Sequence, residues 1–421
     1  MLKKLKPKSE FSRNVMTLMT GSGIAQAIPI AISPIITRIY TPEDFGILAL
    51  YMSIASILSV IATGRYELAI MLPKKDVDAL NIVILSMLIS CLMSLSSFVV
   101  VFFFNTQITN LLGNSDLSVW LYLLPISIIL TGIYQSLNYW NNRKKYYKEL
   151  ALGRIIQSGT GSSFNLGFGF LGFGGGGLIF SGFIGQVAAT SFLSKIVWKE
   201  DSKLLIHINK LKIIALMKKH KKLPLYNLPN SIIDTFKMSA INILISKFFT
   251  TAVLGQYSLA WRMLVTPASL VGNSLSQVFF QKLASTKKSQ LNKLIIKFIL
   301  KASMIALPMF LIVYFFSIDI FMFIFGPSWK LAGEVASILS PWLFFNFISS
   351  PLSTVYIILN KQEIMLFISM FYMIVPISIL YVLRERDFIY VLHVLSFSMS
   401  AVLICLIGLI LYLTFKIKKE D

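Results

Sequence analysis

The stretch "LNIVILSMLISCLMSLSSFVVVFFF", Leu80 to Phe104, contains 25 residues and not one charged side chain. A helix of about 20 apolar residues is long enough to cross a hydrocarbon layer of roughly 30 Å. Similar runs recur along the whole chain of 421 residues, of which 56% are hydrophobic and only 14% charged. Because a soluble core cannot hide so much apolar surface, the sequence predicts an all-α protein that crosses a membrane many times.

The apolar runs predict about twelve transmembrane helices. They lie near residues 15–37, 45–64, 80–104, 118–140, 151–173, 177–197, 225–247, 258–281, 302–324, 334–358, 364–383 and 389–414. The two cysteines, Cys91 and Cys405, both fall within spans, so they indicate neither a disulfide framework nor a metal site. The three histidines stand apart from one another, and we expect no cofactor and no metal.

The net charge of +21 is distributed unevenly between alternate loops. With the N-terminus inside, the outer segments hold only Arg38, Lys247, Lys330, Arg384 and Arg386, and two basic residues, Lys237 and Arg262, lie within spans. All the other lysines and arginines, out of 39 basic residues, fall in inner segments. By the positive-inside rule this predicts a multi-pass protein with both termini in the cytoplasm. It also removes nucleic acid as the expected partner of the positive charge.

A basic inner stretch divides the chain into two halves. We predict an N-terminal six-helix bundle over residues 1–198, a linker over 199–224 and a C-terminal six-helix bundle over 225–421. "FGILALY" from Phe45 and "LGQYSLA" from Leu254 are short echoes between the halves, as expected of a transporter built from two repeats. The linker repeats apolar residues at helical spacing, which favours an amphipathic helix on the inner leaflet over a solvated linker. These residues are Leu204, Ile208, Leu211 and Ala215.

Two predicted spans carry polar stripes. On span 225–247 the stripe consists of Asn227, Asn230, Ser231, Asp234, Lys237 and Asn242. On span 258–281 it consists of Ser258, Arg262, Thr266, Ser269, Asn273, Ser276 and Gln277. Because a helix that faces lipid would not carry so many polar groups on one side, we expect both stripes to line a water-filled cavity.

Lys237 has an alternative explanation, an ion pair with Asp234 one turn before it. A charge near the bilayer centre costs about 3 kcal/mol, whereas a pair at this spacing returns only a few tenths, so a cavity role is favoured. Arg262 has no acid within a turn, and a guanidinium suits phosphate oxygens. The predicted substrate-binding residues are Lys237, Arg262, Asn242, Thr266, Asn273 and Gln277.

"GFGFLG", Gly167 to Gly172, matches the GxGxxG pattern of dinucleotide sites, but it ends a membrane span and lacks the acidic residue expected about 20 positions later. Close helix packing or an outer turn is the favoured explanation. Every outer loop is too short for an extramembrane catalytic domain. The sequence therefore predicts a protein that is not an enzyme.

Several segments together resemble the Wzx-like polysaccharide and O-antigen flippases. They are "RIYTPEDFG" from Arg38, "GRYELAIMLPKKD" from Gly64, "PNSIIDTFK" from Pro229, "VLGQYSLAWRMLVTP" from Val253, "FFQKLA" from Phe279 and "FGPSWKLAGE" from Phe325. Their order and spacing cover nearly the whole chain. The resemblance implies the multidrug, oligosaccharidyl-lipid and polysaccharide exporter superfamily, with two six-helix bundles in a V around a central cavity that opens alternately to each side.

The resemblance also implies the substrate and the place of action. The expected cargo is an oligosaccharide on a polyprenyl pyrophosphate, moved from the inner to the outer leaflet of the bacterial cytoplasmic membrane for surface polysaccharide assembly. Membrane lipids, a coupling H⁺ or Na⁺ and other polysaccharide-assembly proteins are the further expected partners. Asp234 is the first candidate for the coupling acid, with Asp319 and Glu67 behind it. The alternatives are a cation-coupled multidrug exporter of the same superfamily and, disfavoured by the short outer loops, a glycan polymerase or ligase.

Overall fold

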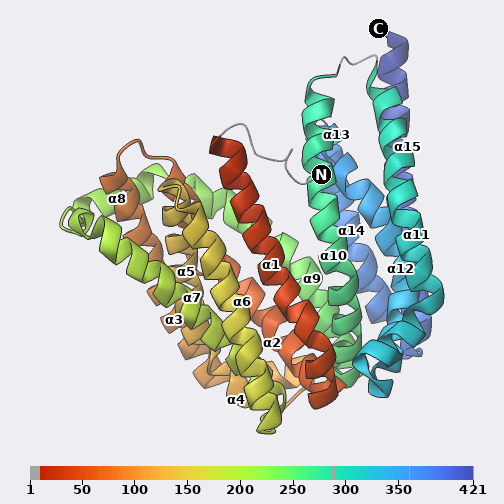
Figure 1. Ribbon diagram of the computed structural model, residues 1–421, viewed down its shortest axis with the longest axis horizontal. Coiled ribbons are helices and arrows are strands. Elements are labelled where there is room, and N and C mark those ends of the chain that lie inside the picture. Colours follow the sequence, from red (N-terminus) through yellow and green to blue (C-terminus); the bar gives the residue numbers. More distant parts are fainter. Residues whose placement is uncertain (1–9, 287–289, 360, 421) are drawn as a thin grey trace. The chain divides into compact units, whose positions relative to one another are not determined.

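The computed structural model describes residues 10–286, 290–359 and 361–420, and within these ranges the chain is helical and contains no β-strand (Figure 1). By its internal contacts the chain divides into two units, Met1–Lys247 and Phe248–Asp421. Unit 1 and unit 2 are described in turn.

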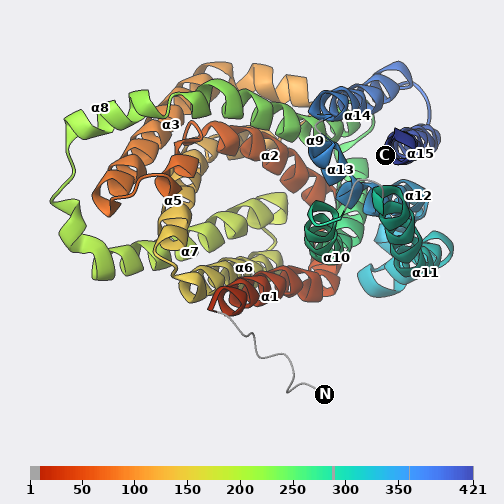
Figure 2. The same cartoon turned by 90° about the horizontal axis from the view of Figure 1, so that it is seen from above.

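Unit 1 is built from long helices with short connections (Figures 1 and 2). In chain order it contains α1 (Glu10–Ile39), α2 (Pro42–Ile61), the 3₁₀ helix η2 (Tyr66–Met71), α3 (Asp76–Leu112), α4 (Leu117–Leu121), α5 (Leu124–Arg143), α6 (Tyr147–Phe170), α7 (Gly174–Leu205), α8 (Lys210–Lys219), the π-helical turn η3 (Leu223–Asn227) and α9 (Leu228–Phe248), whose last residue opens unit 2.

Unit 2 is also built from long helices with short connections. It contains α10 (Thr251–Ala284), α11 (Leu291–Phe325), the 3₁₀ turn η5 (Pro327–Trp329), α12 (Lys330–Leu352), α13 (Thr354–Ile358), α14 (Gln362–Val382) and α15 (Phe388–Glu420). α12 packs against α10, α11 and α15 and is more buried than α11 and α15, with Trp342 in its core.

The predicted all-α membrane fold is confirmed. Among the described residues, the helices of 20 residues or more are α1, α2, α3, α5, α6, α7, α9, α10, α11, α12, α14 and α15, and each overlaps one predicted span. The fourth predicted span is divided between α4 and α5, and the tenth between α12 and α13. The chain is therefore a multi-pass membrane protein.

Eight helical segments in the described ranges are long and apolar enough to cross a membrane by length and composition alone. The helices α6, α9 and α10 are long, with 24, 21 and 34 residues, but they fall outside that group. Two of these three, α9 and α10, carry the polar stripes that the sequence predicts. Their lower hydropathy follows from those side chains and not from insufficient length.

The predicted bundle boundaries are not tested by these contacts and stay a prediction. The linker, however, differs from its predicted form. α7 continues to Leu205, and α8 is a helix of only ten residues. Its buried side chain is Leu216, which joins the hydrophobic core of unit 1, while the predicted stripe residue Leu211 is 76% exposed. The break between α7 and α8 therefore divides the predicted apolar face between two helices, while its contact with the inner leaflet stays a prediction.

Some of the segments that carry the family resemblance contain side chains that cap the starts of helices. At the start of α2, the Thr41 hydroxyl accepts from the Asp44 amide while the Asp44 carboxylate accepts from the Thr41 amide, which is a capping box. At the start of α12, the Gln256 amide donates to the Ser328 carbonyl and accepts from the Ala332 amide. These side chains satisfy backbone groups that a helix end leaves unpaired.

The glycine-rich turn after α6 also serves packing. α7 begins at Gly174, and a Cβ on Gly176 would lie 1.7 Å from the Trp120 ring. Only glycine allows so close an approach. "GFGFLG" and the glycines after it thus form a helix end and a tight helix contact, which agrees with the favoured sequence interpretation.

An ion-pair network joins α3, α5 and α7 at one end of unit 1. Asp76 accepts from Arg143 at 2.9 Å and from Lys144 at 3.0 Å, and Lys144 also lies 3.2 Å from Asp201. The Trp140 indole donates to the other Asp201 oxygen at 2.9 Å. Burial alone would lower the pKa of Lys144, but its hydrogen bonds to Asp76 and Asp201 outweigh that effect and raise the pKa.

Candidate functional site

Lys237 and Asp234 form an ion pair on α9. The Lys237 Nζ lies 2.9 Å from an Asp234 carboxylate oxygen, and the two side chains are 19% and 60% exposed. The lysine is thus half-buried while its partner remains open to solvent. This pair is the alternative explanation that the sequence offers for Lys237. A pair with an exposed acid still leaves the lysine able to meet a stronger anion, so the cavity role of both residues stays a prediction.

Asn242 is used differently from what the stripe on α9 suggests. Its side-chain amide donates to the Ser53 hydroxyl on α2 at 2.9 Å. One turn earlier, the Ser239 hydroxyl lies 3.0 Å from the Ser53 carbonyl and 3.1 Å from the Ser56 hydroxyl. We call these four residues the α2–α9 seam. These hydrogen bonds join α2 to α9, so this part of the stripe helps to hold two helices of unit 1 together.

Arg262 on α10 has an exposed side chain. None of the ion pairs within the described residues involves it. Thr266, one turn later, is partly buried and its carbonyl accepts from the Ser269 hydroxyl at 2.8 Å. Gln277 is exposed, and the side chain of Asn273 lies outside the described residues. α10 therefore offers an exposed guanidinium that no acid among the described residues pairs with, and an exposed side-chain amide.

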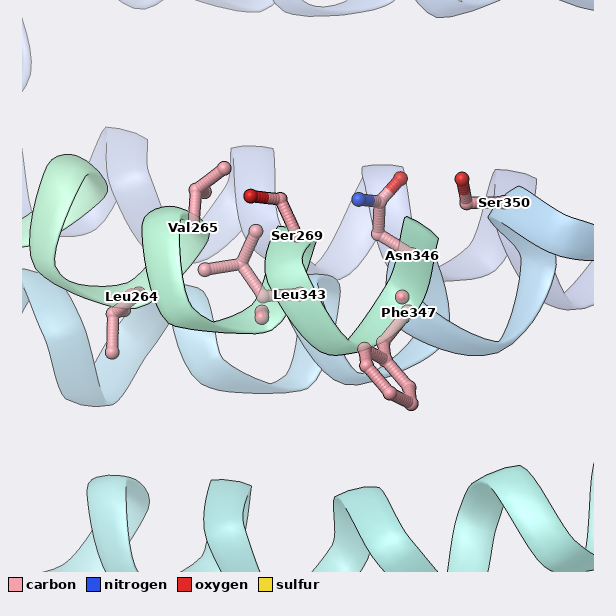
Figure 3. Close-up of a pocket in the computed structure, with 9 residues that line it drawn as sticks. Leu264, Val265, Ser269, Leu343, Asn346, Phe347 and Ser350 are labelled. Carbon is pink, nitrogen blue, oxygen red and sulfur yellow. The ribbon is translucent and has the colours of Figure 1, made fainter. Parts of the chain in front are cut away.

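A small cavity lies between α10 and α12 within unit 2. Its volume is about 110 Å³, and its polar lining consists of Ser269, Asn346 and Ser350. Figure 3 shows these three side chains pointing to the same side, whereas Leu264 and Phe347 point away from it. We call this the α10–α12 cavity. Ser269 is the one described residue of the two predicted stripes that lines it.

The polar residues of α12 were missed by sequence reasoning. Asn346 and Ser350 are four residues apart, so they share one helix face, but they stand in the apolar run "WLFFNFISSP" with no charged neighbour. The sequence signal for them is this spacing of four residues. It gains meaning only beside a second helix, α10, whose Ser269 lines the same cavity. Without the fold, the partner helix is unknown.

The other two acids considered for coupling occupy different surroundings. Asp319 on α11 is exposed. Glu67 in η2 is 1% exposed, lies 3.3 Å from Arg65 and accepts a hydrogen bond from Thr63. Gly64 and Arg65 are both in the left-handed region, with φ of 59° and 64°, which turns the chain so that this pair can form. Glu67 is thus a paired, enclosed carboxylate.

The same turn is joined by hydrogen bonds to η3 and α8, the elements that follow α7. Arg65 donates to the Asn227 side chain in η3 at 2.9 Å, and the Tyr66 hydroxyl donates to the Met217 carbonyl in α8 at 3.1 Å. Asn227, which the sequence places on the α9 stripe, therefore binds Arg65. The segment "GRYEL" has a structural role that its resemblance alone does not reveal.

Comparison with known protein families gives a match over most of the chain. A family model described as polysaccharide biosynthesis protein matches residues 35–334. The chain belongs to that family. No curated protein matches the sequence.

Solved structures with the same fold are transporters. This polysaccharide biosynthesis protein is similar to a multidrug resistance MATE family transporter of the MOP superfamily in its inward-facing conformation, with a TM-score of 0.65, 14% identity, and coverage of 96% of this chain and 95% of that one. The outward-facing conformation gives a TM-score of 0.59, 13% identity and 96% coverage of both chains.

A third similar structure is a MOP superfamily transporter from Pyrococcus furiosus, with a TM-score of 0.57, 14% identity and 96% coverage of both chains. It is described with the words "reverse polarity of binding pocket suggests different function". At these identities the likeness concerns the fold alone. The chain therefore has the all-helical fold of MOP superfamily transporters.

Proposed function

We propose that the protein is a flippase that moves a polyprenyl-pyrophosphate-linked oligosaccharide from the inner to the outer leaflet by alternating access. The family supports a role in polysaccharide biosynthesis, and the fold supports a membrane exporter. Such a protein needs no chemical step. It must exchange the hydration of a sugar phosphate headgroup for protein contacts while the prenyl tail stays in lipid.

The observation that carries the proposal is Arg262. Its side chain is exposed on α10, a predicted transmembrane helix, and no acid within the described residues pairs with it. A guanidinium facing lipid at this depth would cost at least about 3 kcal/mol, whereas one facing an aqueous cavity would not. Its planar set of donors matches phosphate oxygens in pairs. We therefore assign Arg262 to the pyrophosphate, together with Lys237 from unit 1.

Neutral polar groups would hold the sugars. Ser269, Asn346 and Ser350 converge on the α10–α12 cavity, and Thr266, Asn273 and Gln277 lie on the same helix as Arg262. Amides and hydroxyls both donate and accept, as sugar hydroxyls require. Asn242 remains a candidate contact, although its amide now belongs to the α2–α9 seam.

Energy coupling is proposed to use H⁺ or Na⁺ with Asp234 as the carrier. Asp234 is the acid on the α9 stripe, and its exposure of 60% leaves it reachable by water. Protonation of Asp234 would release Lys237 from its partner. The lysine charge offered to the pyrophosphate would then depend on the state of the acid.

The proposed location is the bacterial cytoplasmic membrane with both termini inside. The support is the charge asymmetry of the loops. His207, between α7 and α8, is exposed and belongs to a predicted inner segment. A cysteine in place of His207 should therefore react with an impermeant reagent only in opened cells. Reaction in intact cells would overturn the orientation.

The alternatives make different demands on the site. A cation-coupled multidrug exporter would favour acids facing a cationic drug, but the in-span charges here include the two basic residues Lys237 and Arg262. A polymerase or ligase would favour a sizeable outer loop, but the predicted outer loops are short. A genetic experiment separates these functions. Deletion should strand complete lipid-linked repeat units on the cytoplasmic leaflet, whereas their appearance unpolymerised on the outer leaflet would indicate a polymerase or ligase instead.

A further inference from the structure

A groove runs between the first halves of α1 and α6 in unit 1, outside every site described so far. Its volume is about 500 Å³, which is in the range of small-molecule pockets. Gly21 and Ala151 form its floor, since a Cβ on Gly21 would lie only 2.4 Å from the Ala151 Cβ. Met16, Ile24 and Leu152 form its walls. Their side chains are 44%, 47% and 41% exposed, so the groove is apolar and open along its length.

The two helices that form the groove run parallel. Residues later on the first segment contact residues later on the second: Ser22 contacts Arg154, and Tyr40, just after α1, donates to the Asn165 carbonyl. Figures 1 and 2 show α1 and α6 side by side. Lys148 and Ile155, the first and last groove residues along α6, are seven positions apart, which corresponds to about 10 Å. The groove therefore has a charged end and an apolar end.

Lys148 provides the charge, and it has no ion-pair partner among the described residues. Its neighbours Arg143 and Lys144 are held by Asp76 and Asp201. Lys148 is exposed, and no acid within the described residues lies within ion-pair distance of it. It is also the second residue of α6, where the positive end of the helix dipole adds to its attraction for an anion. Thr20, exposed on α1, adds a hydroxyl to the same groove.

An apolar channel with an ammonium at one end complements an anionic lipid. The ammonium can pair with the lipid phosphate, and the channel can hold an acyl chain. The loop charges predict that this end of α1 and α6 faces the cytoplasmic leaflet, where anionic phospholipids attract basic residues. We propose that the α1–α6 groove binds one glycerophospholipid with an anionic headgroup, its phosphate on Lys148 and Thr20 and an acyl chain along Ile24, Leu152 and Ile155. The site does not depend on the proposed transport of a glycan.

The test is native mass spectrometry of the purified full chain released from mixed micelles that contain equal amounts of phosphatidylglycerol and phosphatidylcholine. One lysine near an anionic lipid contributes about 1 kcal/mol, which corresponds to about a fivefold change in affinity. We expect Lys148→Gln to lower retention of phosphatidylglycerol about fivefold and to leave phosphatidylcholine unchanged. Thr20→Trp, which fills the groove, should lower retention of both lipids.

Lys145 supplies the matched control, because it is an exposed lysine three residues away that does not line the groove. Its φ of 62° is tolerated by asparagine, so Lys145→Asn removes the same charge without backbone strain. This variant should keep its phosphatidylglycerol. Equal retention in wild type and Lys148→Gln would overturn the proposal, as would an equal loss in Lys145→Asn, which would indicate diffuse attraction. Preferential retention of a polyprenyl phosphate offered in the same micelles would overturn the assignment to a glycerophospholipid.

Lys148 is exposed, so Lys148→Gln should fold as wild type does. Its thermal unfolding midpoint in detergent checks this independently of lipid. If Thr20→Trp does not fold, the comparison of Lys148→Gln with Lys145→Asn still decides the proposal.

Discussion

The α2–α9 seam and the α10–α12 cavity are built from the same residue types and do opposite things. In the seam, Asn242 and Ser239 find hydrogen-bond partners on α2. In the cavity, Ser269, Asn346 and Ser350 line an open space of about 110 Å³. Polar groups within a membrane span thus either hold helices together or line space, and the neighbouring helix decides which.

The charged residues differ in the same sense. Lys237 has an ion-pair partner at 2.9 Å, whereas Arg262 has none among the residues that the structure describes. A cation without a partner is the stronger indication of a ligand, because nothing else offsets its presence in a span. The predictions below test whether paired polar groups contribute mainly to stability and unpaired ones mainly to transport.

The largest effect is expected at Arg262. Replacement by alanine would remove the proposed bidentate phosphate contact, of about 3 kcal/mol, so export should fall about 100-fold at unchanged membrane levels of the protein. Arg262→Lys should recover part of the export, since the positive charge remains but the paired donor geometry of the guanidinium is lost. Surface polysaccharide in a deletion strain carrying each variant is the readout. Normal polysaccharide with Arg262→Ala would remove the cation from the mechanism.

Lys237 is expected to behave similarly, with a further test in its partner. Lys237→Ala should also abolish export without lowering protein levels, although Asp234 is then left unpaired, because that carboxylate is already 60% exposed. Asp234→Asn distinguishes its two roles. If Asp234 carries the coupling ion, this variant should lose accumulation driven by an ion gradient. Unchanged gradient-driven export would leave Asp234 as a charge-balancing group only.

Asn242 and Asn346 form a matched pair of asparagines. Asn242→Ala removes a hydrogen bond between helices and should lower the free energy of unfolding by about 1 kcal/mol. Asn346→Ala should change stability by less than about 0.5 kcal/mol and weaken apparent substrate affinity about fivefold. Unfolding midpoints and concentration-dependent transport measure the two effects. A transport defect at full stability in Asn242→Ala would instead support the sequence prediction that this residue contacts substrate.

The smallest effect is a pH dependence at Lys144. Since its pKa is raised in the folded state, its contribution is complete below the unfolded pKa of about 10.4 and is lost as the pH rises through the folded value. At pH 7, Lys144→Met should be less stable than wild type by about 1 kcal/mol. The difference in unfolding midpoint should shrink as the pH rises past the unfolded pKa and through the raised folded pKa of Lys144. A difference that stays constant would assign the loss to packing against Trp140.

The sequence predicted the number and place of the long helices, because a membrane span must be apolar over a fixed length. It also predicted that α9 and α10 differ from the other spans. It could not predict that Asn242 meets Ser53, 189 residues away, or that Ser269 lies near Asn346. Helical periodicity defines a face and not its neighbour. For the same reason the α1–α6 groove, which needs two helices at once, left no trace in the sequence.

The break between α7 and α8 shows a second limit. A regular apolar spacing from Leu204 to Ala215 suggested one helix, but the chain leaves helical geometry after Leu205 and restarts at Lys210, where Asn209 caps the new helix through the amides of Leu211 and Lys212. A cap costs a sequence only one residue, so it is easily missed within a periodic run.

The central claim is that the protein carries a lipid-linked oligosaccharide across the bilayer through contacts with Arg262. Its most direct test uses proteoliposomes loaded with a fluorescent polyprenyl-pyrophosphate oligosaccharide and an impermeant reagent outside. Wild-type protein should expose the inner-leaflet pool to the reagent, and Arg262→Ala should leave that pool protected at equal reconstitution. Equal exposure with both proteins, or none with either, would contradict the account.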